Sequence, residues 1–356
     1  MQADLLKPLI STPPGFSLAD AERIAADHFG IQAKARLLVS DRDQNFRLDA
    51  EDGTRFTLKI ANPAEQRQVV NFQNAALRHV AERDASIPVP RVIPTCDGQL
   101  HTSVNNAGRA HIVRVLSWLD GMVLQDAKAG RKLAGRLGSM LARLGLALAD
   151  FDHPGCSPAS LWDMKRAGGL RELLPHIKDS TISQLISETL GRFEIHVQPV
   201  LKTLRTQVIY NDLNPGNVLL DEADPQRICG IIDFGDLTKS PLIIDLAVAA
   251  AYQLAEGDDP LAGALPLIAG YHAVCPLQRE EMKLLTDLIR TRLITSLLIN
   301  AYRTALFPQN CEYLMIHHDA VKASLVGLSR LAANTALERI IAVCDREIQS
   351  DNQQQS

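Results

Sequence analysis

Residues 208–236 constrain the fold of this chain more than any other stretch of its sequence. They read VIYNDLNPGNVLLDEADPQRICGIIDFGD. The stretch contains three short apolar runs, and aspartate and proline residues typical of turns separate the last two. We therefore predict short strands, the last two joined as a hairpin, with Asp212, Asn217 and Asp233 at strand ends. That geometry can bring two carboxylates and one carboxamide together.

These three side chains suit phosphoryl transfer, a reaction whose barrier is overcome mostly by positioning and by neutralising phosphate charge. Asp212 can orient an acceptor hydroxyl, and Asn217 and Asp233 can supply the hard oxygen ligands that Mg²⁺ prefers. The order D-L-x-x-x-N followed by D-F-G matches the catalytic loop and metal motif of protein kinases. In the alternative interpretation, Asp212 and Asn217 only form an Asx turn and Asp233 caps a strand.

Residues 208–236, together with residues 241–247 (PLIIDLA), resemble the aminoglycoside phosphotransferase and choline kinase superfamily. The resemblance covers nearly the whole chain. It implies an α+β, bilobal protein-kinase-like fold, with an antiparallel sheet and a helix in a small N-terminal lobe and a large, mainly helical C-terminal lobe. Within the superfamily the chain looks most like hydroxylysine kinases and the kinase domains fused to aminotransferases. That narrower resemblance rests on residues 43–46 (DQNF), 72–77 (FQNAAL), 211–214 (NDLN) and 233–252.

The resemblance also implies a division of the chain. Residues 1–116 would form the N-terminal lobe with its leader helix, sheet and nucleotide-covering loop, and residues 117–121 the hinge. Residues 122–349 would form the helical lobe with the catalytic loop and metal site. The tail, residues 350–356 (SDNQQQS), is polar, and we expect it to be disordered.

Composition narrows the class of protein. The chain has 356 residues, 46% of them hydrophobic, which is enough for two lobes with their own cores. A net charge of −4 gives no basic field to attract nucleic acid or an anionic membrane. Six cysteines without C-x-x-C spacing argue against a metal knuckle and for reduced thiols, and no apolar run reaches membrane-spanning length. We expect a cytoplasmic protein whose partners are a nucleotide and a small-molecule alcohol.

The N-terminal part predicts a helix followed by strands. Ser17 and Asp20 form a capping-box pattern for a helix that Gly30 ends, and strands are expected in the residues that follow. The predicted strands are residues 35–39, 46–50, 56–60, 100–104 and 111–116.

The loop of residues 40–45 lies where a kinase covers the nucleotide phosphates. It contains no glycine, so backbone amides and the side chains of Ser40, Arg42, Gln44 or Asn45 would bind the phosphates. A solvated hairpin loop accounts for the same composition.

Lys59 lies on the third strand, on the face opposite Leu58 and Ile60, and a lone lysine there can simply be solvated. The resemblance implies that it holds the α- and β-phosphates of the nucleotide. The superfamily orients this lysine with a glutamate on the next helix, which we expect from Pro63 to about residue 81. This chain has Gln73 instead. Gln73 can pair weakly with Lys59, or Glu65 in the first helical turn can take over as its partner. In the third alternative, Gln73 forms a hydrogen bond with backbone.

The hinge would bind the base of ATP or GTP through the backbone of Ser117 and Leu119. The sequence does not distinguish the two bases. Helices are predicted over residues 131–151 and 180–204, the second kinked at Pro199. The resemblance gives Asp245 a structural role, in which its buried carboxylate supports the catalytic-loop backbone; a helix N-cap is the alternative.

A polar stripe marks the helix predicted over residues 284–303. Arg292, Ser296, Asn300 and Arg303 recur at i, i+4, i+8 and i+11. Solvation explains many such stripes, but an arginine here can also pair with the carboxylate of an amino-acid substrate. Arg292, Arg303 and Asp236, itself alternatively a minor metal ligand, are thus candidate substrate residues.

The resulting hypothesis is a kinase that moves the γ-phosphate of a nucleotide to an amino alcohol or a hydroxy amino acid, with hydroxylysine favoured. Aminoglycoside, choline or ethanolamine, and homoserine-type kinases are the alternatives within this class. A pseudokinase that acts by conformation is the alternative outside it. Tyr210 and Asn211 replace the superfamily's histidine and glycine before Asp212. Tyr210, Gln73 and the glycine-free loop favour the pseudokinase. The residues that oppose it are the intact Asp212, Asn217, Asp233 and Lys59.

Overall fold

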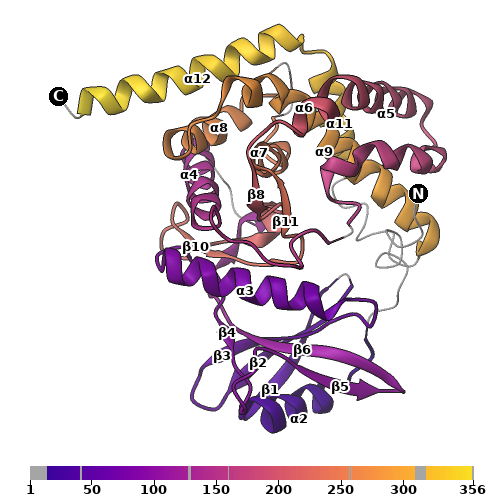
Figure 1. Cartoon of the computed structure of the whole chain (residues 1–356), viewed down its shortest axis with the longest axis vertical. Coiled ribbons are helices and arrows are strands. Elements are labelled where there is room, and N and C mark those ends of the chain that lie inside the picture. The colour runs from indigo at the N-terminus through magenta and orange to yellow at the C-terminus, as the bar shows by residue number, and fades with distance from the viewer. Residues whose placement is uncertain are drawn as a thin grey trace.

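A computed structural model describes residues 14–40, 42–126, 130–158, 160–255, 257, 259–308 and 318–354. A sheet with two helices lies at one end of the molecule, and a larger helical region lies at the other (Figure 1). Asp41, in the expected phosphate loop, lies outside the described residues. The α+β class with an N-terminal sheet and a mainly helical C-terminal part is confirmed.

The N-terminal sheet is antiparallel throughout. Its strand order is β1-β2-β3-β6-β4, with β5 paired to β6. All five predicted strands are present within one to three residues, and the short β4 was not predicted. The strands are β1 (Ala33–Leu38), β2 (Gln44–Ala50), β3 (Arg55–Ile60), β4 (Val92–Ile93), β5 (Thr102–Asn106) and β6 (Arg109–Ser117).

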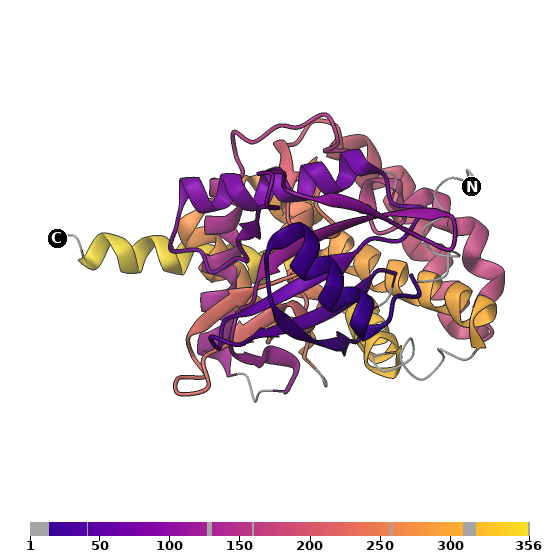
Figure 2. The same ribbon diagram turned by 90° about the horizontal axis from the view of Figure 1, so that it is seen from below.

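One face of this sheet packs against α2 (Leu18–Phe29), which crosses the strands in Figure 2. The predicted capping box is present, because Ser17 accepts from the Asp20 N–H while Asp20 reaches back to the Ser17 N–H. Gly30 ends the helix with φ +67°, a backbone conformation that favours glycine. The buried side chains between helix and sheet are Ile24, Phe29, Phe46, Leu58, Val113 and Val115.

The opposite face carries polar residues in register. Asn45 pairs with Lys59 across β2 and β3, and Lys59 pairs with Arg114 across β3 and β6. Side chains directly opposite each other in antiparallel strands share a face, and neighbours along each strand alternate. This row of Asn45, Lys59 and Arg114 therefore lies on the side of the sheet away from α2.

Helix α3 (Arg67–Arg83) joins the sheet to the helical region. It begins four residues after the predicted start at Pro63, because the Asn62 side chain caps a tight turn by accepting the Ala64 N–H. Its buried face, including Phe72, belongs to the core of the large region; the Phe72 ring stacks 6.0 Å from that of Phe151.

The chain crosses between the two regions over a few residues. β6 ends at Ser117, and the next strand already pairs with the large region. The elements that follow are β7 (Met122–Val123), a 3₁₀ turn (Leu124–Asp126), α4 (Arg131–Ala147), a 3₁₀ helix (Met164–His176), α5 (Ser180–Arg192), a π-helical turn (Phe193–Val197), α6 (Gln198–Leu201), β8 (Thr206–Ile209), a 3₁₀ turn (Pro215–Asn217), β9 (Val218–Leu220), β10 (Ile228–Ile231), β11 (Thr238–Pro241), α7 (Leu242–Ala251), α8 (Ala264–Val274), α9 (Arg279–Leu306), α11 (His318–Ser329) and α12 (Ala333–Gln354). The limits of the predicted lobes and hinge stay predictions.

Two short sheets carry the central stretch of the sequence. The first has the order β10-β9-β7 and the second pairs β11 with β8. The predicted hairpin is therefore present as β9 and β10. The helix predicted over residues 180–204 is interrupted by the π-helical turn just before Pro199, whose ring and missing N–H disturb the preceding turn.

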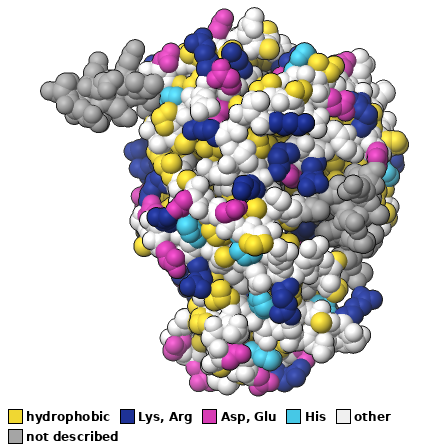
Figure 3. Space-filling model, in the orientation of Figure 1, with side chains coloured by type: hydrophobic (Ala, Val, Ile, Leu, Met, Phe, Trp, Pro, Cys, Tyr) yellow, Lys and Arg dark blue, Asp and Glu magenta, His cyan; other side chains and the backbone are white. Residues whose placement is uncertain are grey.

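The last helix, α12, continues to Gln354, so the prediction of disorder from Ser350 is wrong over that segment. Once a helix is nucleated, adding a residue costs little, which lets it extend through a polar sequence. No helix among the described residues is long and apolar enough to cross a membrane. On the face shown in Figure 3, acidic and basic side chains are interspersed.

Close packing of α4 on α8 depends on glycine. A Cβ added at Gly138 would clash with the Leu267 carbonyl oxygen on α8. A Cβ added at Gly191 on α5 would meet no atom within 4 Å. Gly138→Ala is expected to destabilise the protein by about 1–3 kcal/mol, because the two helices must separate. Gly191→Ala is expected to stabilise it by about 0.5–1 kcal/mol. Urea unfolding of both variants checks this, and equal shifts would contradict it.

Candidate active site

The loop between β8 and β9 is held in one shape by its own amides. The Asn214 side chain accepts from the Gly216 N–H (2.7 Å), and the Asn217 N–H donates to the Asn214 carbonyl (3.0 Å). The Asn217 carboxamide then donates to the Asp212 carbonyl (3.1 Å) and to Asp212 Oδ2 (2.7 Å). The Asx turn that the alternative interpretation expected is present, but Asn214 forms it.

Asp245 fixes the start of this loop. It lies in the first turn of α7 and is buried, with Oδ1 accepting the Asn211 N–H (2.7 Å) and Oδ2 accepting the Tyr210 N–H (3.2 Å). Burial raises the pKa of Asp245 to about 7, and the two backbone hydrogen bonds oppose that rise. The carboxylate therefore supports catalytic-loop backbone, as predicted, and does not cap the helix.

Tyr210 and Asn211 preserve the loop in a different way from the superfamily's histidine and glycine. The Tyr210 hydroxyl donates to the Ile232 carbonyl, and its ring meets that of Phe234 edge-on at 5.0 Å. Asn211 has φ +65°, a conformation that glycine adopts freely and asparagine tolerates. Its side chain donates to the Asp236 carbonyl (3.2 Å). These two residues tie the loop to the strand end that carries Asp233.

The Asp212 carboxylate has a different neighbour on each oxygen. Oδ2 accepts from Asn217, whereas Oδ1 accepts from Asn214 (3.0 Å) and lies 3.6 Å from Nη2 of Arg292. Burial, together with the nearby carboxylate of Asp236, raises the pKa of Asp212 to about 8, and Arg292 opposes this. The deprotonated form of such a carboxyl group, which dominates above this pH, can take up a proton during a reaction.

Asn217 and Asp233 are neighbours through the backbone. The Ile232 N–H donates to the Asn217 carbonyl (2.9 Å), which places the residue before Asp233 opposite Asn217 in the β9–β10 pair. Asp233 has φ +58°, and its carboxylate accepts the Gly235 N–H (3.1 Å). No group of three or more His, Cys, Asp or Glu side chains arranged to hold a metal ion occurs among the described residues. One carboxylate and one amide oxygen suit Mg²⁺, which relies on substrate phosphates and water for its other ligands.

Lys59 reaches across from the sheet to this strand end. Its Nζ lies 3.5 Å from Asp233 Oδ1, and only 11% of the lysine side chain is exposed. The Lys59 charge holds the pKa of Asp233 below its usual range, against the effect of burial. The solvated alternative for Lys59 is therefore wrong.

Of the alternatives for Gln73, the structure shows the one in which its side chain bonds to backbone, and it shows Asp233 beside Lys59 instead. Oε1 of Gln73 accepts from Arg114 Nη2 (2.5 Å), its Nε2 donates to the Gly235 carbonyl (3.4 Å), and Asn74 accepts from the other Arg114 nitrogen (2.8 Å). Glu65 interacts with Arg42 and Arg114, while burial raises its pKa. The partner of Lys59 is Asp233.

Arg114 is a site residue that the sequence analysis missed. It is buried directly opposite Lys59, and Asp43, Asp233 and Glu65 stabilise its charge. A charged residue inside the apolar run of β6 was the available signal. The neutral oxygen of Gln73 satisfies this arginine without adding another buried charge.

The expected phosphate loop is packed differently from the prediction. Gln44 exchanges two hydrogen bonds with the backbone of Phe16 (both 2.8 Å), so its carboxamide already has partners and is a weaker candidate for binding phosphate. Ser40 closes the loop by donating to the Asp43 carbonyl (2.6 Å). Arg42 lies 3.9 Å from Asp236, and Asn45 lies directly opposite Lys59 in the sheet. The Arg42 guanidinium and the Asn45 amide NH₂ group can both donate, so they remain the phosphate candidates here.

At the crossing between the two regions, Ser117 is occupied within the sheet. Its N–H donates to the Arg91 carbonyl and its hydroxyl accepts the Arg91 N–H, both at 2.8 Å. Gly121 follows with φ +150°, where a side chain would strike Cys229 and the Leu220 carbonyl. The Leu119 backbone is the better candidate of the two for contacting a base.

The stripe on α9 faces the interior, so solvation does not explain it. Arg292 and Arg303 are buried, and Ser296 and Asn300 are half-buried. Arg292 adjoins Asp212 and lies 4.7 Å over the ring of Trp162. Arg303 follows eleven positions later, roughly 16 Å along the helix axis. The two arginines are too far apart along the helix to bind the same carboxylate. Of the two, Arg292 is the one that lies beside Asp212.

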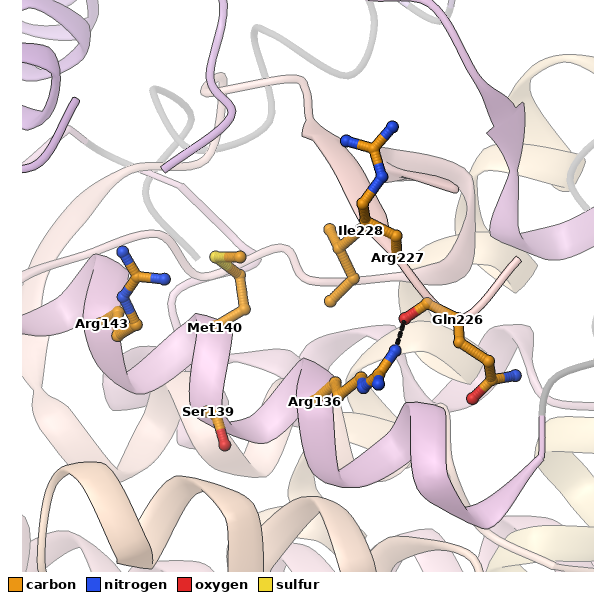
Figure 4. A pocket seen from close by; sticks show the side chains of 7 residues that line it. All are labelled: Arg136, Ser139, Met140, Arg143, Gln226, Arg227 and Ile228. Atoms are coloured by element: carbon orange, nitrogen blue, oxygen red, sulfur yellow. Dashed lines mark hydrogen bonds between the residues drawn. The ribbon is translucent and has the colours of Figure 1, made fainter. Parts of the chain in front are cut away.

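A separate hollow of about 300 Å³ lies between α4 and the start of β10 (Figure 4). Its apolar floor includes Met140 and Ile228. The three arginines at its rim have partners already: Arg136 donates to the Gln226 carbonyl (2.5 Å), Arg143 pairs with Asp84 (2.6 Å), and Arg227 pairs with Asp221. None of the residues that line it belongs to the catalytic loop.

Comparison with known proteins identifies the family. Residues 34–285 match the model of the phosphotransferase enzyme family. The chain belongs to this family. The predicted resemblance is confirmed, and the protein is a phosphotransferase that acts on a hydroxyl acceptor.

Individual relatives agree with this assignment. A hydroxylysine kinase of Mus musculus is 27% identical, with 86% of this chain and 87% of the relative covered. A homoserine kinase of Burkholderia cenocepacia is 26% identical, over 78% and 82%. Among solved structures, an amicoumacin kinase in complex with AMP-PNP, Ca²⁺ and Ami superposes with a TM-score of 0.65 at 15% identity, covering 84% of this chain and 93% of that one. A spectinomycin phosphotransferase gives a TM-score of 0.54 at 12% identity, covering 93% and 99%. These structures confirm the fold.

Asp245→Asn tests the support of the loop. An asparagine offers one acceptor oxygen and sets an NH₂ group against a backbone N–H, so we expect a loss of about 1–3 kcal/mol in unfolding free energy and a loss of phosphotransfer. Asp221→Asn is the control, since Asp221 also accepts two backbone N–H groups but in the β9–β10 turn. The idea fails if the two variants lose activity equally.

The raised pKa of Asp212 predicts a pH profile. Below about pH 8 the carboxyl group holds its proton and cannot accept one from a hydroxyl, so kcat/KM for the acceptor should rise with pH and level off above about 8. Asp236→Asn removes the neighbouring negative charge and should move the midpoint to lower pH. Steady-state kinetics across pH 6–10, a range set around that pKa, measure both profiles. An unchanged midpoint in Asp236→Asn would contradict the assignment.

Proposed function

We propose that this phosphotransferase moves the γ-phosphate of ATP or GTP to the hydroxyl group of a hydroxy amino acid, with a hydroxylysine-like acceptor favoured. The observation that carries the proposal is the position of Asp212. Its loop is held by Asp245, its carboxylate is held by two asparagines, and its environment keeps its pKa near the working range of a base. The similarity to hydroxylysine kinases over 86% of the chain supports the acceptor class.

Asp212 orients the acceptor hydroxyl and takes its proton as the oxygen attacks the terminal phosphorus. The hydrogen bond from Asn217 fixes Oδ2, so that Oδ1 and the open edge of the carboxylate face the acceptor side. In this proposal Asn217 and Asp233 hold Mg²⁺. The metal supplies charge neutralisation at the phosphate oxygens when it is bound.

Lys59 is the proposed contact to the α- and β-phosphates. It pairs with Asp233, so nucleotide binding must exchange that pair for a phosphate contact. Arg114, set directly opposite Lys59, adds a second buried positive charge beneath the same region. Asn45 and Arg42 complete the proposed phosphate site, and the Leu119 backbone contacts the base.

Homoserine is the second acceptor that an observation favours, because homoserine kinases match 78% of the chain at similar identity. Both acceptors combine a hydroxyl group with an α-amino acid. The proposal therefore concerns this shared chemistry first and the length of the side chain second.

Direct phosphotransfer assays test the proposal. Purified protein with Mg²⁺ and either ATP or GTP should phosphorylate hydroxylysine, with homoserine, choline, ethanolamine and an aminoglycoside as comparison acceptors. Asp212→Asn should lower turnover about 10²–10⁴-fold while nucleotide affinity stays within a few-fold, because the amide cannot accept the proton. Asp233→Asn should instead weaken Mg²⁺-nucleotide binding. Turnover of none of these acceptors by the wild-type protein would end the proposal.

A further inference from the structure

Arg292 is a buried cation with too few partners. Its side chain is 4% exposed, near the middle of α9. Nη2 donates to the Tyr252 hydroxyl (3.1 Å) and lies 3.6 Å from Asp212 Oδ1. Nε and Nη1, which carry most of the N–H groups of a guanidinium, have no partner among the described residues. Burying such donors is costly unless an acceptor arrives.

The guanidinium is held rigidly in place. It lies 4.7 Å from the ring centroid of Trp162 and 5.8 Å from that of Tyr252, both within the range of cation–π attraction. Trp162 and Tyr252 are themselves only half-buried. The position is therefore fixed by aromatic side chains that border accessible space, while the unused N–H groups stay unpaired.

The position of Arg292 relative to Asp212 indicates which ligand it serves. Asn217, the proposed metal ligand, contacts Oδ2 of Asp212, whereas Arg292 approaches Oδ1. Arg292 thus approaches the carboxylate oxygen that the proposed metal ligand does not contact, and it belongs to α9, which carries none of the proposed phosphate or metal contacts. These observations favour an anion of the acceptor at Arg292 over a phosphate.

We propose that Arg292 binds the carboxylate of the acceptor and so selects hydroxy amino acids over amino alcohols of the same length. This inference rests on the proposed function and adds the residue that determines its specificity. A guanidinium binds a carboxylate through charge-assisted hydrogen bonds, which are about twice as strong as neutral ones. Because Arg292 adjoins Asp212, binding the carboxylate also places the hydroxyl of a short, flexible acceptor beside the base.

The test compares each acid with its decarboxylated counterpart. Wild-type protein is assayed with hydroxylysine and its hydroxy-diamine analogue, and with homoserine and aminopropanol. Arg292→Gln is expected to lower the ratio of kcat/KM for acid over amine about 10- to 100-fold, mainly through KM for the acid. Using the ratio cancels any general effect of the substitution on Asp212.

Two further variants keep the test informative if Arg292→Gln folds poorly. Tyr252→Phe removes only the hydroxyl that holds Nη2, and it should lower the same ratio a few-fold. Arg171→Gln is the matched control: it breaks a partly exposed ion pair with Glu194 and should leave the ratio unchanged. Thermal unfolding reports whether each variant is folded.

Binding without reaction gives a second readout. Lysine lacks the reacting hydroxyl, so it should inhibit the wild-type protein competitively against hydroxylysine, and Arg292→Gln should lose most of that inhibition. The diamine formed by decarboxylating lysine should inhibit both proteins equally weakly.

The possible outcomes separate this inference from the proposed function. If the wild type phosphorylates no hydroxy amino acid, the proposed function fails. If it does, but Arg292→Gln and Tyr252→Phe lower activity equally on acids and amines, Arg292 only positions Asp212 and the inference is overturned. An effect confined to KM for the nucleotide would also overturn it, because the anion would then be a phosphate.

Discussion

Two hydrogen bonds from loop backbone to one buried carboxylate are the interaction on which the site depends. Helix α7 begins directly after β11, and Asp245 lies in its first turn. The Asp245 oxygens accept the N–H groups of Tyr210 and Asn211, the two residues before Asp212. Because β11 pairs with β8, the strand that leads into the loop and the helix that supports it are joined by the same small sheet. These two hydrogen bonds fix the backbone just before Asp212, so the position of the Asp212 carboxylate does not depend on its side-chain contacts alone.

The site brings together more carboxylates than a protein normally places in one spot. Asp236 and Asp233 both lie close enough to Asp212 to raise its pKa, and each of the three carboxylates has a cation from a different element beside it. Lys59 from β3 faces Asp233, Arg42 from the first loop faces Asp236, and Arg292 from α9 faces Asp212. The charge of the site is therefore balanced by the folding together of distant segments. The pKa of Asp212 stays raised, because burial and the Asp236 charge outweigh Arg292.

The sequence predicted what local order determines. Asn217 and Asp233 lie at the open end of the β9–β10 hairpin, and Asp212 lies in the loop after β8, five residues before Asn217, so local spacing indicated that the three are close. The position of Lys59 on the third strand was also predicted, because the strand pattern around it is clear. The partners that come from distant segments were not: Gln73 serves Arg114, Gln44 serves the backbone of Phe16, and the start of α3 moved because Asn62 caps a turn. Each of these hydrogen bonds joins residues whose distance is set by how the sheet, α3 and the helical region pack together. Sequence spacing does not give that distance.

The same packing limits how the cleft can open. Contacts across it are long: 3.5 Å for Lys59 with Asp233, 3.9 Å for Arg42 with Asp236 and 3.4 Å for Gln73 with the Gly235 carbonyl. Contacts near the distance limits of hydrogen bonds and ion pairs are weaker than short ones, so these are the first that an opening motion would break.

In contrast, α3 is part of the core of the large region, where Phe72 and Leu77 are buried, and it cannot leave without exposing apolar surface. Short hydrogen bonds from Arg114 on β6 to Gln73 (2.5 Å) and Asn74 (2.8 Å) also hold the sheet against α3. Opening along the three long contacts therefore moves the loop of Arg42 and the Lys59 side chain more easily than it moves the whole sheet away from α3.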